Sequence, residues 1–217
     1  MLKPTVPVLA PHALHCWRAP LALAPAARQC CEATLDDNER RRAALFASAA
    51  LRERWVAARG QTRMLLAAYA GIPAAAVRFT HGAHGKPALV TQAHGTALHF
   101  NLSHSGAELL LGVGRAALGV DLEWVAPELD IDAMLPVCTA AERDYIAADP
   151  LPRFYRCWTR KEARLKAGGE GLGGALHLLD TTGPRLDGWE LHSWSADGYM
   201  LAVAARPGSV LTHHRFA

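Results

Sequence analysis

Two carboxylates stand two residues apart in the segment Gly119–Glu123. If this segment is a strand, alternation places Asp121 and Glu123 on one face, while Val120 and Leu122 point into apolar packing. Like charges this close repel each other unless a cation joins them, and hard oxygen ligands without a nearby cysteine suit Mg²⁺. The alternative is an exposed strand end that binds nothing.

A second polar group lies on segment 154–168, which has the spacing of an amphipathic helix. Glu162 and Lys166 are one helical turn apart on it. They can form a surface ion pair worth a few tenths of a kcal/mol. Alternatively, Glu162 is a third carboxylate for the metal, and Lys166 binds phosphate.

A third polar group, Ser103 and His104, lies in segment 100–106, where a strand ends in a polar turn. A hydroxyl and an imidazole at such a turn are available to a ligand, although a single histidine is usually structural. No acid lies in a pattern that would make Ser103 or Ser105 the nucleophile of a hydrolase, so we discount nucleophilic catalysis.

Basic residues supply the charge that a polyphosphate ligand needs, because arginine and lysine donate strongly to phosphate oxygens. For any single arginine, a solvated helix face is the commoner explanation. The basic residues in question are Arg40, Arg41, Arg42, Arg54, Arg63 and Lys86, the last within Gly85-Lys86-Pro87.

Zinc chemistry and disulfides are not indicated. The eleven histidines include no HExxH pattern, and the five cysteines show no CxxC spacing. We expect reduced, mostly buried thiols.

Composition indicates a soluble cytoplasmic protein. The chain has 217 residues, 51% hydrophobic and 20% charged, which is enough for one sizeable core or two small ones. Its apolar stretches are interrupted before they reach membrane-helix length, and the N-terminus has no leader pattern. A net charge of +3 fits an anionic ligand or an acidic partner, not a nucleic-acid-binding protein.

The elements that must position these residues follow from apolar periodicity. An initial strand is expected at Val6–Leu9 or His15–Arg18, and one long helix or two stacked helices between Glu39 and Tyr69. Strands are then predicted at Val77–Thr80, Ala97–Leu102, Leu109–Val113 and Leu118–Glu123. Helices are predicted at Asp130–Leu135, Thr139–Ala148 and Arg153–Ala167, and final strands at Ala175–Leu179, Trp189–Trp194 and Tyr199–Ala205.

Helices followed by strands therefore occur twice. This rhythm predicts an α+β chain of two similarly built lobes, residues 1–118 and 119–217, that meet near Gly119. Clefts between such lobes favour ligands.

Together, Gly119–Glu123, Trp158–Ala163 and Lys166 resemble the two signatures of the 4'-phosphopantetheinyl transferases. The pair of signatures is far more specific than either half. The similarity extends from Leu35 to Ala205 and includes Gly85-Lys86-Pro87, Asn101–Ser105 and Tyr199–Val203. Length and lobes resemble the monomeric, pseudo-dimeric type that activates carrier domains of peptide and polyketide synthetases.

The resemblance implies a magnesium-dependent reaction of coenzyme A (CoA) in the cleft between the lobes. Asp121, Glu123 and Glu162 would hold Mg²⁺, and Asp121, Glu162 and Lys166 would serve catalysis. The serine hydroxyl of an acyl or peptidyl carrier protein would attack the β-phosphate of CoA, and 3',5'-ADP would leave. Glu162 would accept the serine proton directly or through a water.

The resemblance also assigns residues to CoA. Lys161 and Lys166 would lie by the pyrophosphate, Ser103 and His104 would contact phosphates, and Lys86 would lie near the adenine. Arg42 would bind the 3'-phosphate and Arg54 would lie beside the nucleotide. A neighbouring basic position of the family is Glu39 here, where Arg40 or Arg41 could compensate.

The acidic carrier would meet apolar and basic residues near the cleft, for which Ile131–Val137 and Phe154–Cys157 are candidates. The same apolar residues could instead pack inside the protein. The alternative function is a non-catalytic regulator that binds CoA or a nucleotide, which would not need the paired carboxylates.

Overall fold

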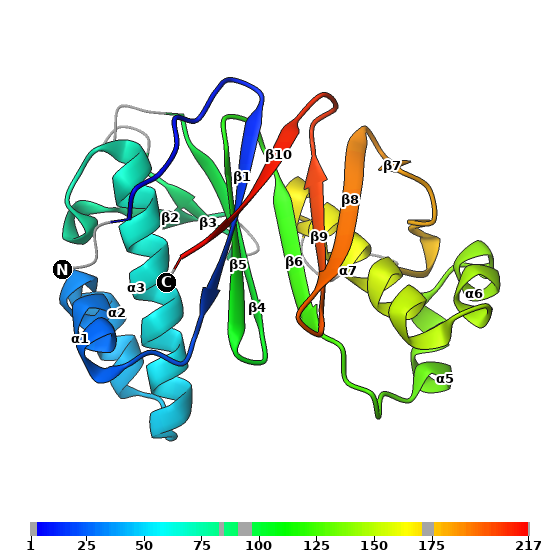
Figure 1. Ribbon diagram of the computed structural model, residues 1–217, viewed down its shortest axis with the longest axis horizontal. Helices are drawn as coiled ribbons and strands as arrows, with labels where there is room; N and C mark the ends of the chain where they lie inside the picture. Colours follow the sequence, from blue (N-terminus) through cyan, green and yellow to red (C-terminus); the bar gives the residue numbers. More distant parts are fainter. Residues whose placement is uncertain (1–3, 83–84, 91–96, 171–175, 217) are drawn as a thin grey trace.

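Two four-stranded sheets pack face to face, with helices on their outer sides, in the computed structural model (Figure 1). This account covers residues 4–82, 85–90, 97–170 and 176–216, which the structure describes. Within them, no helix combines the length and apolarity that crossing a membrane requires.

The first lobe begins with a strand, continues with helices and ends in a hairpin. Its elements are β1 (Ala13–Pro20), α1 (Pro25–Thr34), α2 (Asp37–Ala44), α3 (Ala49–Ala70), a 3₁₀ turn (Ala74–Ala76), β2 (Phe79–His81), β3 (Pro87–Leu89), β4 (His99–Ser105) and β5 (Glu108–Gly114).

The second lobe repeats this order. Its elements are β6 (Gly119–Trp124), α5 (Ile131–Met134), a 3₁₀ turn (Leu135–Val137), α6 (Ala140–Ala147), α7 (Pro150–Gly168), a 3₁₀ turn (Leu176–Leu178), β7 (Arg185–Leu186), β8 (Trp189–Ala196), β9 (Tyr199–Ala205) and β10 (Val210–Arg215).

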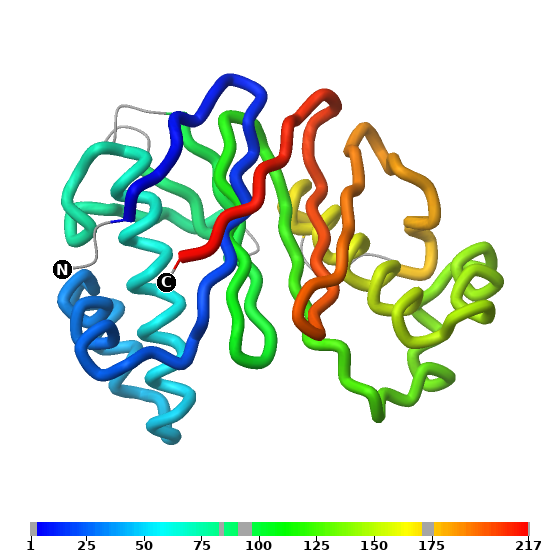
Figure 2. The backbone as a smooth tube through the Cα atoms, in the orientation of Figure 1, coloured from blue at the N-terminus to red at the C-terminus, as the bar shows by residue number. Residues whose placement is uncertain are grey.

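Strand order reveals the same topology in both halves. The strand orders are β10-β1-β5-β4 and β6-β9-β8-β7. In each lobe, the last strand of the hairpin pairs antiparallel with the first strand of the lobe: β5 with β1, and β9 with β6. The expected two-lobed α+β fold is confirmed. The division between residues 118 and 119 stays a prediction, because β10 returns to pair in parallel with β1 (Figure 2).

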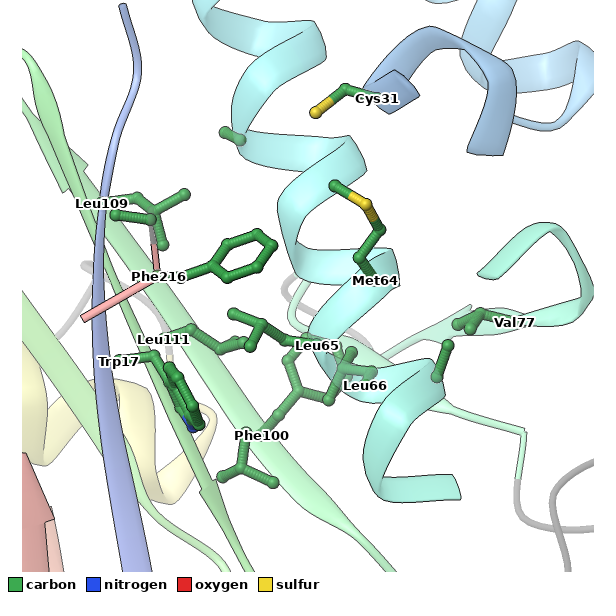
Figure 3. Packing of buried hydrophobic residues seen from close by; sticks show 14 of the residues in the cluster. Trp17, Cys31, Met64, Leu65, Leu66, Val77, Phe100, Leu109, Leu111 and Phe216 are labelled. Carbon is green, nitrogen blue, oxygen red and sulfur yellow. The ribbon is translucent and has the colours of Figure 1, made fainter. Parts of the chain in front are cut away.

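The two sheets pack through one face of each, and helices cover the other face. In β5, Leu110 faces the second sheet, whereas Leu109 and Leu111 face α3 (Figure 3). In β9, Leu201 and Val203 likewise join the layer between the sheets, and the alternating alanines pack on α7. A strand buried on both faces reads as a continuous apolar run, which is the pattern of β5 and β9.

Local signals explain the helix boundaries. A capping box formed by Asp36 and Glu39 starts α2, and Ser48 caps α3, which ends at Gly71 in the left-handed conformation with φ 69°. Of the two alternatives, one long helix or two, the structure has two helices, because the chain turns between Ala44 and Ala49.

Other sequence expectations have mixed outcomes. The early strand is the later candidate, at Ala13–Pro20 instead of Val6–Leu9. The strand expected at Ala175–Leu179 is wrong: Leu176–Leu178 forms a 3₁₀ turn, and residue 175 lies outside the described residues. Helix α1 and strand β10 were not anticipated from the sequence.

Gly119 lets α7 lie directly against β6. A Cβ atom there would lie 2.0 Å from the carbonyl oxygen of Ala163 and 2.4 Å from the amide nitrogen of Ala167. Both are backbone atoms and cannot yield as a flexible side chain would. The absence of a side chain at Gly119 thus sets the spacing between the strand that carries Asp121 and the helix that carries Glu162.

Gly119→Ala should therefore lower the free energy of unfolding by about 1–3 kcal/mol, because the added methyl group overpacks this contact. Urea denaturation would measure the change. Gly183→Ala is the matched control, since its Cβ would lie 4.0 Å from the nearest atom, the carbonyl oxygen of Arg185. Equal stability of the two variants would contradict the close packing.

Candidate active site

A pocket of about 320 Å³ opens where β4 of the first lobe meets β6 and α7 of the second. Its lining combines carboxylates, one ammonium, a hydroxyl, an imidazole and an indole. The lining residues are Leu102, Ser103, His104, Asp121, Glu123, Trp158, Glu162 and Lys166. All eight lie in the three polar segments that the sequence singles out, residues 100–106, 119–123 and 154–168.

The strands β4 and β6 belong to different sheets and are joined by side chains. Asn101 Oδ1 accepts a hydrogen bond from the Val120 amide at 2.8 Å, and Ser105 Oγ accepts one from the Trp124 amide at 3.1 Å. Between them, Ser103 Oγ donates to an oxygen of Asp121 at 2.8 Å. These three residues alternate along β4, so one face of the strand makes the contact between the lobes.

Asp121 is the most deeply buried carboxylate of the pocket, with 1% of its surface exposed. Its Oδ1 accepts hydrogen bonds from Lys166 Nζ at 2.6 Å and from Ser103. Lys166 Nζ also donates to Ser103 Oγ at 3.1 Å. The ammonium, hydroxyl and carboxylate thus form a closed triangle across the two lobes.

Glu162 lies one helical turn from Lys166 and is 7% exposed. Burial, followed by the negative charge of Asp121, raises the pKa of Glu162 to about 7, against the partial opposition of Lys166. Burial also raises the pKa of Glu123, and hydrogen bonds from Ser105 and Trp158 act in the opposite direction. The carboxylates therefore carry more negative charge than the pocket neutralises.

Two carboxylate oxygens of the pocket are free to bind a divalent cation. Asp121 Oδ2 and Glu162 Oε1 are buried and have no hydrogen-bond partner among the described residues. Unpartnered carboxylate oxygens under mutual repulsion are suitable for a hard cation such as Mg²⁺, which also accepts water and phosphate oxygens. In the described part of the chain, however, no three such side chains are close enough to form a complete metal site by themselves.

Lys161 requires a correction, because the structure does not place it by this pocket. Its Nζ is buried and forms an ion pair with Glu142 at 2.6 Å, and it donates to the carbonyl oxygens of Val137 at 3.0 Å and Leu176 at 2.6 Å. Adjacent positions on a helix diverge by about 100°, so Lys161 points away from the face of Glu162.

The two arginines expected at the nucleotide do not line the pocket either. Arg42 is exposed on α2, with its guanidinium carbon 5.9 Å from the ring centre of Trp55, and Arg54 is exposed on α3. Glu39, at the family's basic position, is buried and binds Arg63 at 2.7 Å and Arg59. It therefore ties α2 to α3.

Lys86 is half-buried, and its ammonium binds backbone carbonyls at the end of α7 and the start of β6. Trp158 lines the pocket, although its place in the signature Trp158–Ala163 assigned it no chemical role. Its spacing of four residues from Glu162 could have indicated the pocket, because residues at i and i+4 share a helix face.

Of the two candidate carrier-docking segments, Phe154–Cys157 is mostly internal. Phe154, Tyr155 and Cys157 are buried in a cluster that includes Ile146 and Met200. Residues Ile131–Val137 form α5 and the 3₁₀ turn that follows it; their apolar side chains pack against the edge of this cluster, while Asp132, Ala133 and Pro136 are exposed.

Comparison with known proteins gives the same family from both halves of the chain. A model described as the 4'-phosphopantetheinyl transferase superfamily matches residues 117–212. A second model, for the N-terminal part of a 4'-phosphopantetheinyl transferase, matches residues 24–113.

Curated relatives extend this similarity. The chain is 35% identical over 182 residues to 4'-phosphopantetheinyl transferase HetI of Nostoc sp., which covers 78% of this chain and 74% of that protein. It is 36% identical over 137 residues to 4'-phosphopantetheinyl transferase AcpT of Escherichia coli O157:H7, covering 60% and 65%. A phosphopantetheinyl transferase of Thraustochytrium sp. is 30% identical over 192 residues, covering 79% and 66%.

The raised pKa of Glu162 has a measurable consequence for stability. Between the ordinary carboxyl pKa of 4.5 and the folded value of about 7, the folded state binds more protons than the unfolded state. Stability of the metal-free protein should therefore fall as pH rises through this window. Glu162→Gln should remove the effect and be more stable than the wild type at pH 8 by about 2 kcal/mol.

Urea denaturation in EDTA at pH 5 and pH 8 measures this difference. Glu128→Gln, at an exposed position, is the matched control and should follow the wild type at both pH values. The same pH dependence in Glu162→Gln and in the wild type would show that Glu162 titrates normally.

Proposed function

The chain belongs to the 4'-phosphopantetheinyl transferase superfamily, and we propose that it moves the phosphopantetheine arm of CoA onto a serine hydroxyl of an apo carrier protein. The single observation that carries the proposal is the pocket that Asp121, Glu123, Glu162 and Lys166 line together. A phosphoryl transfer requires this combination, because positioning and charge neutralisation do most of the work.

Mg²⁺ is the proposed metal, held by Asp121, Glu123 and Glu162 together with oxygens from the substrate. The unpartnered oxygens of Asp121 and Glu162 support this assignment. When bound, the ion would neutralise negative charge on the pyrophosphate and on the leaving group.

CoA would enter between the lobes with its pyrophosphate in this pocket. Lys166, Ser103 and His104 line the pocket and can donate to phosphate oxygens. Arg42 and Arg54 are exposed on the first lobe, away from the pocket lining, and are the proposed contacts for the 3'-phosphate end. CoA is an extended molecule, so its two ends need separate sets of cations.

Glu162 is the proposed general base. The serine oxygen would attack the β-phosphorus, the bond to 3',5'-ADP would break, and Glu162 would take the serine proton directly or through a water. A carboxylate whose pKa is about 7 is basic enough to accept this proton near neutral pH. Lys166 would offset the charge that develops on the leaving phosphate.

One chain supplies both sides of this site, since Ser103 comes from the first lobe and Asp121 from the second. We therefore propose a monomer. The carrier protein would be acidic around its serine and would meet the exposed parts of Ile131–Val137, with Arg153 and Arg156 nearby on α7.

Intact mass spectrometry tests the reaction. Purified apo carrier proteins, incubated with the chain, CoA and Mg²⁺, should each gain the mass of one phosphopantetheine arm if they are substrates. EDTA should abolish the gain, and excess Mg²⁺ should restore it, because the carboxylate pocket requires a cation.

Asp121→Ala is the matched inactive control. No mass gain on fatty-acid, polyketide or peptide carriers, despite measurable CoA binding, would indicate a non-catalytic CoA-binding regulator. Failure to bind CoA as well would contradict the assignment to this reaction.

Glu162→Gln separates catalysis from folding. The amide keeps the shape of the side chain but cannot accept the serine proton, so turnover should fall by about 10²–10⁴-fold. Circular dichroism should show an intact fold, and calorimetry should show retained CoA binding. Exposed Glu128→Gln should keep full turnover, and near-normal turnover in Glu162→Gln would remove the proposed base.

A further inference from the structure

Lys86 lies at the turn of the β2–β3 hairpin in the first lobe, and the local backbone holds it there. Gly85 has φ 75°, a left-handed conformation that glycine adopts without strain. The Gly82 amide donates to the Lys86 carbonyl at 3.0 Å, and Pro87 starts the short strand β3. The side chain therefore leaves the hairpin in a fixed direction.

The ammonium of Lys86 ends among backbone carbonyls of the second lobe. It donates to the carbonyl oxygens of Leu118 at 3.2 Å and Ala167 at 3.5 Å, and to that of Lys166. Leu118 directly precedes β6, whereas Lys166 and Ala167 form the last turn of α7. One cation thus binds the C-terminal end of a helix and the start of its neighbouring strand.

Carbonyl groups in the last turn of a helix lack partners within the helix and carry the negative end of its dipole. A lysine ammonium has three N–H groups and no acceptor. Each N–H group of the Lys86 ammonium can donate to one of these three carbonyl oxygens, so no donor remains for a ligand. Burial lowers the pKa of Lys86, and the carbonyl dipoles compensate for the lost water.

At the same end of β6, α7 lies so close to the strand that there is no room for a side chain. Gly119 follows Leu118 directly, and any side chain there would collide with Ala163 and Ala167. Lys86 therefore closes the end of this contact, with its ammonium bound directly to the backbone carbonyl of Lys166. The side chain of Lys166 leads from that point to Asp121 and Ser103.

We propose that Lys86 is a positioning residue that fixes the last turn of α7 against β6, and so holds Lys166 in register with Asp121, without contacting CoA. The inference rests on the proposed transfer reaction, and it replaces the assignment of Lys86 to the adenine of CoA. It makes the hairpin of the first lobe responsible for the geometry of a helix in the second.

The two roles give different kinetics. Loss of a CoA contact raises the KM for CoA and leaves kcat nearly unchanged, whereas misplacement of Lys166 lowers kcat. A shift of about 1 Å in a catalytic group can cost up to about a hundredfold in rate. Lys86→Met keeps the apolar stem and removes all three donors.

Steady-state kinetics of Lys86→Met should be measured with CoA and with 3'-dephospho-CoA. We expect kcat to fall at least about tenfold and the KM for either donor to change by less than about twofold. The control is His81→Ala, at an exposed position of the same hairpin, which should behave like the wild type. A raised KM with unchanged kcat would overturn the proposal. If Lys86→Met does not fold, Lys86→Gln is measured in its place.

Hydrogen exchange gives a readout that is independent of activity. In the ligand-free protein, the amides of Gly169 and Glu170 donate to the carbonyl of Leu165. These amides should exchange about tenfold faster in Lys86→Met, because the last turn of α7 opens more often. Unchanged exchange would overturn the proposal. A wild type that modifies no carrier would overturn the transfer reaction and leave the exchange result valid.

Discussion

The contact between the sheet edges β4 and β6 is the constraint on which the site depends. Three small polar side chains, Asn101, Ser103 and Ser105, take the place of backbone pairing between the two strands. Side-chain bridges hold two strands farther apart than a backbone ladder does, so a pocket opens beside them. Ser103, the middle residue of the three, binds Asp121, so the two lobes are joined within the pocket.

Helix α7 completes the pocket, and separate contacts hold two of its sides in place. One side packs on β6 through Gly119, and another is anchored by the buried pair of Lys161 with Glu142. Arg160 adds hydrogen bonds to the carbonyl oxygens of Thr181, Gly183 and Leu191. A buried ion pair is costly to break, since one partner would remain charged without water. The helix therefore presents Glu162 and Lys166 from a rigid frame, which suits a reaction that depends on positioning.

Several charged side chains of this protein stabilise the fold and do not line the pocket. Lys161, Glu39 and Arg63 are signature or basic-cluster positions in the sequence, yet all three are buried in ion pairs. The carboxylates around Lys166 differ, because the pocket leaves some of their oxygens unpartnered and raises the pKa of Glu162 to about 7. The candidate site therefore differs from the buried ion pairs because its charged groups are not all neutralised by partners, and not because it is charged.

The sequence by itself determined the repeated α+β pattern and the central strands β5 and β9. It also determined the pairing of Asp121 with Glu123, because alternation and helical period are local properties of the chain. It did not determine α1, the return of β10 to the first sheet or the directions of Lys86 and Lys161. Those depend on contacts between residues far apart in the chain. Only the tertiary structure decides which charges are neutralised by backbone carbonyls and buried partners, and which remain available to a substrate.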